Sequence, residues 1–247
     1  MSDKPRIIPV PQRIHLCRPA FYNLNGEPKH RTLKNGQPDI GTPARPKKRR
    51  WTVTLLLDPT NAQAKETIAS IKNEADRLMD DRYEGRANWP KANPATGMGG
   101  PIWCFGEGNQ LPKVYSGFKD MWYIKCSFTE DPADDTVRPI LGSLDGREVR
   151  LLSDGWHVVD KNHRPTEEKV DQAICPYAGC NARARISLYT YDNESRGVNA
   201  NIISLQFVSK NTSFGGRSAA SADDEFEKQY GDYVAAQQAS APDPFAN

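Results

Sequence analysis

The stretch Arg183-Ala184-Arg185-Ile186-Ser187-Leu188-Tyr189-Thr190-Tyr191 alternates at period two and predicts a β-strand with two unlike faces. Successive side chains of a strand point to opposite sides, so the small and aliphatic residues share one face, suited to a core. Charge for phosphates and flat rings for bases are what a surface that binds single-stranded nucleic acid requires. The other face supplies both, and its candidate binding residues are Arg183, Arg185, Tyr189 and Tyr191. The alternative is an ordinary sheet face whose tyrosine rings pack under a loop.

The segments on either side of this strand predict its surroundings. Residues 192–197 are polar and indicate a hairpin connection, and residues 198–208 predict the return strand with Ile203, Leu205 and Phe207 on one face. Upstream, Cys175 and Cys180 are separated by four residues, which is not the tight spacing of a zinc knuckle, and no second Cys or His pair follows. We therefore expect a turn with a buried cysteine, and neither a metal nor another cofactor.

Two further segments have a clear strand pattern. In residues 121–128, Trp122, Ile124, Cys126 and Phe128 alternate with outward residues, which include Tyr123 and Lys125. This outward pair repeats the combination of an aromatic ring with a cation. Residues 51–57 predict a strand whose inward positions are Trp51, Val53, Leu55 and Leu57.

The remaining pattern is one helix among short strands. Apolar residues between 62 and 82 recur at spacings of three and four, which predicts one long amphipathic helix. Short strands are expected near 13–18, where Ile14 and Leu16 share a face, and at 138–141, 149–152 and 156–159. The fold class predicted is mainly β with one long helix and long loops.

Two loop regions carry further candidate binding residues. Residues 31–50 form a basic loop that ends in four consecutive cations, which need either water or phosphate around them. We interpret this loop as an arm that contacts a nucleic-acid backbone, the alternative being a solvated loop. Residues 84–114 are irregular and aromatic, and their rings either stack on bases or fill the core. The candidates from both regions are Lys48, Arg49, Arg50, Trp103, Phe105 and Lys113.

The last thirty residues have a different composition from the body. Residues 218–247 hold six acidic side chains and one lysine, whereas the whole chain of 247 residues has a net charge of +2. Such a segment buries too little apolar surface to fold, so we expect a disordered tail. A basic body with an acidic tail is typical of proteins that handle nucleic acid, although a solubilising terminus has the same composition. The tail residues expected to bind partners are Asp223, Asp224, Glu225, Asp243 and Phe245.

Composition and the N-terminal segment exclude several classes of protein. The five cysteines are widely spaced in a chain without an apolar secretion signal, so we expect them to be reduced and mostly buried. No apolar run of about 18 residues is present, which predicts no membrane span. The four histidines are scattered and no paired carboxylate motif accompanies them, so we expect a protein that is not an enzyme.

The order of motifs resembles a known family. Arg138-Pro139, Cys175-x-Tyr177-x-Gly179-Cys180, the Arg/Tyr strand, Gly197-Val198 and Phe214-Gly215-Gly216 are similar to those of a family of phage single-stranded-DNA-binding proteins. The resemblance covers roughly residues 100–217. The tail resembles that of the family only in its acidic character. It implies an OB-type β-barrel over residues 1–217 that coats and protects single strands during phage replication or recombination. It also implies that the tail at 218–247 competes with DNA and recruits replication or recombination proteins of phage or host.

The resemblance sets further expectations. Beside it, we expect a monomer or weak homo-oligomer, cooperative on DNA or not, with no membrane partner. Because the chain shows neither a secretion signal nor a membrane span, we expect it in the cytoplasm of an infected bacterium. Preference for DNA over RNA follows from the resemblance alone, because phosphate contacts and stacking do not distinguish the two. The alternative from another class is a structural or virion protein that binds only protein.

Overall fold

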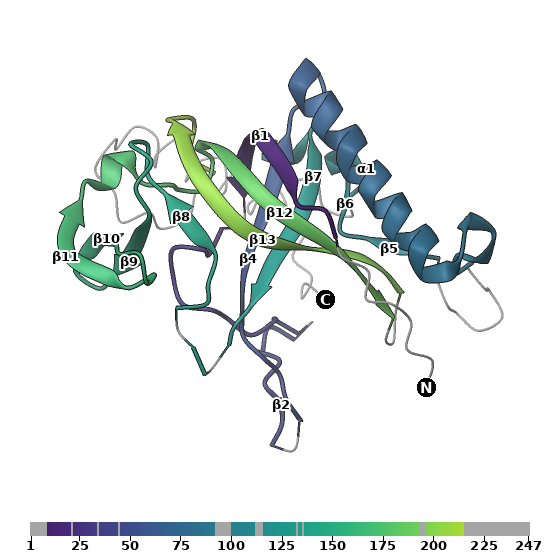
Figure 1. Ribbon diagram of the computed structural model, residues 1–247, viewed down its shortest axis with the longest axis horizontal. Coiled ribbons are helices and arrows are strands. Elements are labelled where there is room, and N and C mark those ends of the chain that lie inside the picture. The colour runs from purple at the N-terminus through teal and green to yellow at the C-terminus, as the bar shows by residue number, and fades with distance from the viewer. Residues whose placement is uncertain are drawn as a thin grey trace, which may run out of the picture.

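Two long antiparallel strands, β12 (Asn181–Asp192) and β13 (Arg196–Ser209), form the central hairpin of the fold (Figure 1). The computed structural model describes residues 9–20, 22–33, 35–43, 45–91, 100–111, 116–131, 133–134, 136–192 and 196–214. Both predicted strands are confirmed, although they extend into the connection predicted at 192–197: Asp192 ends β12, Arg196 begins β13, and 193–195 lie outside the described residues. The Arg/Tyr strand lies in the interior of a sheet, between β13 and β1 (Gln12–Ala20).

Three other strands close this hairpin into a barrel. They are β1 (Gln12–Ala20), β4 (Arg50–Leu57) and β7 (Trp122–Thr129), in the spatial order β13-β12-β1-β4-β7. The ring closes because β7 also pairs with β13, in parallel, at Ala200–Cys126 and Asn201–Ser127. A five-stranded Greek-key barrel of this kind is the OB fold. The predicted fold class is confirmed.

The side chains that the alternating pattern predicted to face inward fill the interior of the barrel. Trp51, Val53 and Leu55 of β4 have at most 4 % of their surface exposed. The predicted inward residues of β7 are also buried, except Phe128, which is half-buried against the core. The same cluster includes Ala184, Ile186 and Leu188, so the apolar face of the Arg/Tyr strand is the core face.

The helix α1 (Ala62–Tyr83) packs on this core along one side of the barrel (Figure 1). It begins after Asn61, whose side chain accepts hydrogen bonds from the N–H groups of Gln63 and Ala64, as an N-cap does. Its apolar stripe, including Ile71 and Leu78, belongs to the same cluster as the barrel interior. The predicted helix is confirmed, and its role is packing.

Shorter elements complete the structure. A small separate sheet of β9 (Val149–Leu152), β10 (Gly155–Val159) and β11 (Pro165–Val170) lies to one side, and the sequence pattern did not predict β11. The remaining strands are β2 (Gly41–Thr42), β3 (Arg45–Pro46), β5 (Ile102–Trp103), β6 (Phe105–Glu107) and β8 (Ile140–Gly142). The 3-10 turns are η1 (Arg86–Asn88), η2 (Gly108–Gln110), η3 (Ser116–Phe118) and η4 (Gln172–Ile174).

Two β-bulges change which residues face the core. In β1 the register shifts between Ile14 and Cys17, so Cys17 is buried and Leu16 is 41 % exposed, although period two places Leu16 inside. A shift opposite Arg185 likewise buries Ile202 and leaves Ile203 half-buried, which corrects the face predicted for Ile203. An extra residue in one strand inverts the alternation beyond it.

All five cysteines are buried and none forms a disulfide. Burial raises the pKa of the Cys175 thiol to about 12 and that of Cys180 to about 11. The predicted burial of the cysteines is thus confirmed. Within the described residues, no helix combines the length and apolarity needed to cross a membrane.

Candidate nucleic-acid interface

The outward faces of four barrel strands form one continuous surface. Ser187 of β12 is the register partner of Asn201 of β13, Asn201 pairs with Ser127 of β7, and Ser127 pairs with Thr52 of β4. Paired residues of neighbouring strands lie on the same side of a sheet. This row therefore runs around the outside of the barrel, and we call the surface that extends from it over β12, β13, β7 and β4 the outer face.

Arginines occupy one end of the outer face. Arg183 and Arg185 are exposed, as predicted, and neither hydrogen-bonds nor pairs with a carboxylate among the described residues. Arg13 of β1 lies directly opposite Arg185 and is exposed as well. Sequence reasoning did not include Arg13 among the candidates, although its place next to buried Ile14 in an alternating segment indicated that it faces outward.

The two tyrosines of β12 follow on the same face and are half-buried. Tyr189 lies opposite Asn199 of β13. Burial raises the pKa of Tyr189, against the opposing effects of the Arg50 charge and of the Asn199 side chain. The Tyr189 ring is therefore held in place by the sheet and lies close to a cation on a different strand.

The structure brings Tyr123 and Lys125 of β7 to the same surface. One strand, β13, separates β7 from β12, which is a distance of about 10 Å at the usual spacing of strands. Lys125 is exposed, and its Nζ atom lies 5.3 Å from the centroid of the Tyr123 ring. Tyr123 is half-buried, and burial raises its pKa. The Tyr123/Lys125 pair and the residues of β12 therefore share one surface.

The three predicted residues of the basic arm have different surroundings. Lys48 and Arg50 are exposed, and Arg50 begins β4 on the outer face, opposite Thr129. Arg49 instead turns to Glu130, whose carboxylate accepts a hydrogen bond from Nε at 2.9 Å and pairs with the guanidinium. A carboxylate thus compensates the charge of Arg49, whose side chain is still 43 % exposed. Its contact with a nucleic-acid backbone stays a prediction.

Trp103 and Phe105 lie in a row of aromatic rings that continues into the core. The ring centroids are 5.9 Å apart for Trp89 and Trp103, 5.5 Å for Trp103 and Phe105, and 5.3 Å for Phe105 and Trp122. Trp103 and Phe105 are half-buried and pack against the core cluster. Their stacking on bases stays a prediction. Lys113 and the tail residues Asp223, Asp224, Glu225, Asp243 and Phe245 lie outside the described residues.

The end of the described chain is anchored beside the outer face. The Arg18 guanidinium lies 4.2 Å from the centroid of the Phe214 ring and donates hydrogen bonds to the carbonyl oxygens of Gly179 and Thr212. Phe214 also packs against the small buried cluster of Ala20, Leu56 and Phe118, against which Tyr123 packs as well. Residue 214, which precedes the acidic segment, therefore shares a packing cluster with one of the predicted binding tyrosines.

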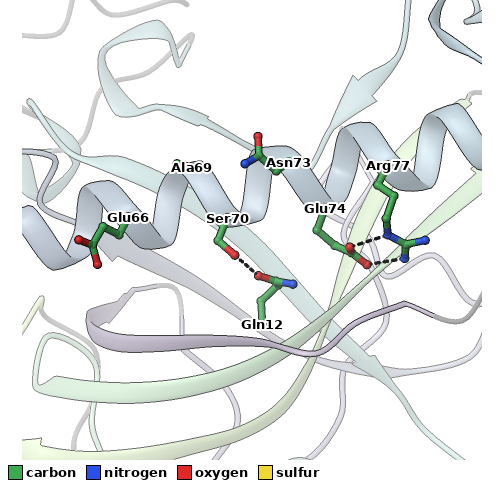
Figure 2. A pocket seen from close by; sticks show the side chains of 7 residues that line it. All are labelled: Gln12, Glu66, Ala69, Ser70, Asn73, Glu74 and Arg77. Carbon is green, nitrogen blue, oxygen red and sulfur yellow. Dashed lines mark hydrogen bonds and ion pairs between the residues drawn. The ribbon is translucent and has the colours of Figure 1, made fainter.

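A depression on the helix side of the molecule has the opposite electrostatic character. It has a volume of about 520 Å³ and lies between α1 and the start of β1 (Figure 2). Glu66 and Glu74 line it, and Arg77 is turned to Glu74, with a shortest distance of 2.8 Å between guanidinium and carboxylate. This arrangement is unsuited to a phosphate. No group of three or more potential metal-ligating side chains occurs among the residues described.

Comparison with known proteins gives both a family and structural relatives. A family model described as the ssDNA-binding protein of Enterobacter phage Enc34 matches residues 41–235. Protein p50 of Acyrthosiphon pisum secondary endosymbiont phage 1 is 33 % identical over 67 residues, which are 27 % of this chain and 35 % of that protein. The chain thus matches about a third of the length of this curated relative.

Two solved structures share the fold. The single-stranded DNA-binding protein from bacteriophage Enc34 in complex with ssDNA superposes with a TM-score of 0.52 at 16 % identity, covering 82 % of this chain and 88 % of that one. A second structure of the single-stranded DNA-binding protein from bacteriophage Enc34 gives a TM-score of 0.50 at 16 % identity, covering 86 % of this chain and 88 % of that one. At this level of identity the likeness establishes the barrel architecture.

Proposed function

Because the chain belongs to the family of the Enterobacter phage Enc34 ssDNA-binding protein, we propose that it binds single-stranded DNA along the outer face of its barrel. The observation that carries this proposal is the row from Ser187 through Asn201 and Ser127 to Thr52, which joins the predicted residues of β12 and β7 into one surface. An OB fold presents its ligand face on the second and third barrel strands, which here are β4 and β7.

Each side chain has a role that follows from its chemistry. The cations neutralise phosphates, and the tyrosine rings stack on bases, at about 1–3 kcal/mol per base. Neither contact reads the edges of bases, so the proposed binding tolerates many sequences. Residues proposed for phosphates are Arg13, Arg183, Arg185, Lys125, Lys48 and Arg50, and those proposed for stacking are Tyr123, Tyr189 and Tyr191.

The acidic segment at 218–247 is proposed to compete with DNA for the same cations. The position of Phe214 supports this, because this last described residue packs against the same cluster, Ala20, Leu56 and Phe118, as Tyr123 of the outer face. When DNA displaces the segment, its acidic residues and Phe245 become accessible to proteins of phage or host replication and recombination. The proposed setting is the cytoplasm of an infected bacterium.

An intrinsic-fluorescence titration tests the proposal directly. Oligo-dT is added to the full chain at two salt concentrations, and the tyrosine and tryptophan emission reports binding. We expect binding that weakens as salt rises, because each neutralised phosphate releases counterions. If no salt-sensitive binding occurs, the proposal fails and the alternative of a protein-binding structural role returns. Magnesium-dependent cleavage of the oligonucleotide would contradict a role in binding without catalysis.

A further inference from the structure

A basic pocket lies next to the outer face, between the segment 23–32 and the start of β4. Its volume is about 370 Å³, and it is lined by Asn23, Lys29, His30, Arg31, Thr32, Arg50 and Thr52. The backbone fixes this arrangement: the Lys29 N–H donates to the Arg50 carbonyl at 3.0 Å, and the Arg50 N–H donates back at 2.9 Å. The Asn23 N–H donates to the Thr52 carbonyl at 3.2 Å. The segment therefore continues the sheet beside β4, and its side chains close one side of the pocket.

The lining has the composition of an anion site. Lys29, Arg31 and Arg50 are exposed, and none of their side chains is hydrogen-bonded or ion-paired to another described residue. No carboxylate is among the lining residues. Lys29 and Arg50 are bridge partners, and like charges at opposed positions repel unless an anion lies between them. The depression beside α1, with two glutamates in its lining, has the opposite character.

Further polar groups complete the pocket. The Nδ1 atom of His30 is enclosed and has no hydrogen-bond partner among the described residues. The Oδ1 atom of Asn23 accepts hydrogen bonds from the Thr52 N–H and hydroxyl groups, so the Asn23 amide is held in a fixed orientation. Such groups contact the sugar or the base edge of a nucleotide in proteins that bind nucleic acid. The volume is at the small end of the range of roughly 300–1,000 Å³ for ligand pockets.

We propose that this pocket takes one nucleotide of the bound strand, a proposal that rests on the function proposed above. Lys29, Arg31 and Arg50 hold its phosphate, and the amide, imidazole and hydroxyl groups contact its sugar and base. The pocket is continuous with the outer face for two reasons. Thr52, which lines the pocket, ends the row of paired polar residues on that face. Arg50, which also lines it, lies close enough to Tyr189 for its charge to oppose the rise in the pKa of Tyr189. A strand that stacks on Tyr189 therefore reaches the pocket along one surface.

The first test removes charge. Lys29→Ala with Arg31→Ala is compared, in the full chain, with Lys65→Ala and Lys72→Ala, which remove the same charge from exposed positions on α1. We expect the pocket variant to bind oligo-dT roughly ten-fold more weakly than the control. The slope of log K against log salt should fall by about 0.7 for each phosphate that the variant no longer neutralises. Thermal unfolding of both variants checks that they remain folded. Equal affinities and slopes in the two variants would overturn the pocket proposal.

The second test changes the shape of the pocket and leaves its charge unchanged. Thr32→Trp places a large side chain in the pocket, and we expect it to weaken binding as well. If Thr32→Trp binds as the unsubstituted chain does while the charge variant is weaker, the cations act only through their general field, and no nucleotide enters the pocket. Photo-cross-linking with an oligonucleotide that contains iododeoxyuridine is expected to label residues 22–33. If the unsubstituted chain does not bind oligo-dT at all, the proposed function itself fails, and this inference with it.

Discussion

Arg13 on β1 and Arg185 on β12 are direct register partners, and both side chains are exposed on the outside of the barrel. Neither is paired with a carboxylate among the described residues. Like charges at opposed positions in an antiparallel sheet are destabilising, within the scale of about 0.2–1 kcal/mol for such pairs. A polyanion bound across both side chains would reverse this effect. Under the proposed function, the pair serves binding and not stability.

Replacing this pair should separate binding from folding. Arg13→Ala with Arg185→Ala is expected to keep or slightly increase the free energy of unfolding in urea, because a repulsion is removed. The same variant should bind oligo-dT more weakly, with a salt slope smaller by about 0.7 for each phosphate that is left without its arginine. Lys65→Ala with Lys72→Ala is the matched control for net charge. A double arginine variant that binds as tightly as this control would show that no phosphate lies between the arginines.

The tyrosines of β12 should contribute through their rings. Tyr189→Ala with Tyr191→Ala is expected to cost about 1–3 kcal/mol of binding free energy for each base that stacks, without unfolding the barrel. Tyr189→Phe keeps the ring and removes only the hydroxyl group, so it should retain most of the affinity. Fluorescence titration measures both variants, and circular dichroism checks the fold. Unchanged affinity in the double variant would rule out the stacking assignment.

The acidic segment should weaken binding in the intact protein. A chain that ends at Arg217 lacks the six acidic residues of 218–247 and is expected to bind oligo-dT more tightly, most clearly at low salt. A full-length variant in which these residues are replaced by Asn and Gln should behave like the truncated chain. Equal affinities for all three chains would mean that the segment does not compete with DNA.

Acid should weaken the contact between α1 and the start of β1. Glu74 is 7 % exposed; burial by itself raises its pKa, but hydrogen bonds from Arg77 and from the Val10 N–H outweigh burial and hold the pKa below its ordinary value of 4.5. A lowered pKa in the folded state stabilises the protein above the ordinary value, and this stability is lost as the pH falls through the lowered pKa. Glu74→Gln should therefore cost roughly 1–3 kcal/mol at pH 7.

The pH dependence of that variant provides the check. Urea unfolding between pH 7 and pH 3 should show the difference between Glu74→Gln and the unsubstituted chain shrinking below about pH 4.5, where Glu74 itself becomes protonated. A difference that stays constant over this range would mean that the charge of Glu74 does not stabilise the fold.

Much of the local structure followed from the sequence because it depends on neighbours along the chain. Alternation gave the inward positions of β4 and β7, and spacings of three and four gave α1. Alternation failed at Leu16 and Ile203, where a bulge inverts the faces. A bulge is set by the partner strand, and a single strand pattern does not report it. Strand β11 was missed because its run Thr166-Glu167-Glu168-Lys169 is polar and its partner, β10, is needed to define it.

The sequence by itself determined the chemistry of the Arg/Tyr strand, since the direction of each side chain depends only on its place in an alternating segment. Tertiary structure alone decided which of these side chains lie on one surface. The pairing of β7 with β13 brings Lys125 to the same surface of the barrel as Tyr189. The pairing of β1 with β12 places Arg13 beside Arg185. It also assigned Arg49 to Glu130 and Trp103 to an aromatic row. Contacts between residues far apart in the chain depend on how strands close around a common core, and a local sequence pattern does not predict that closure.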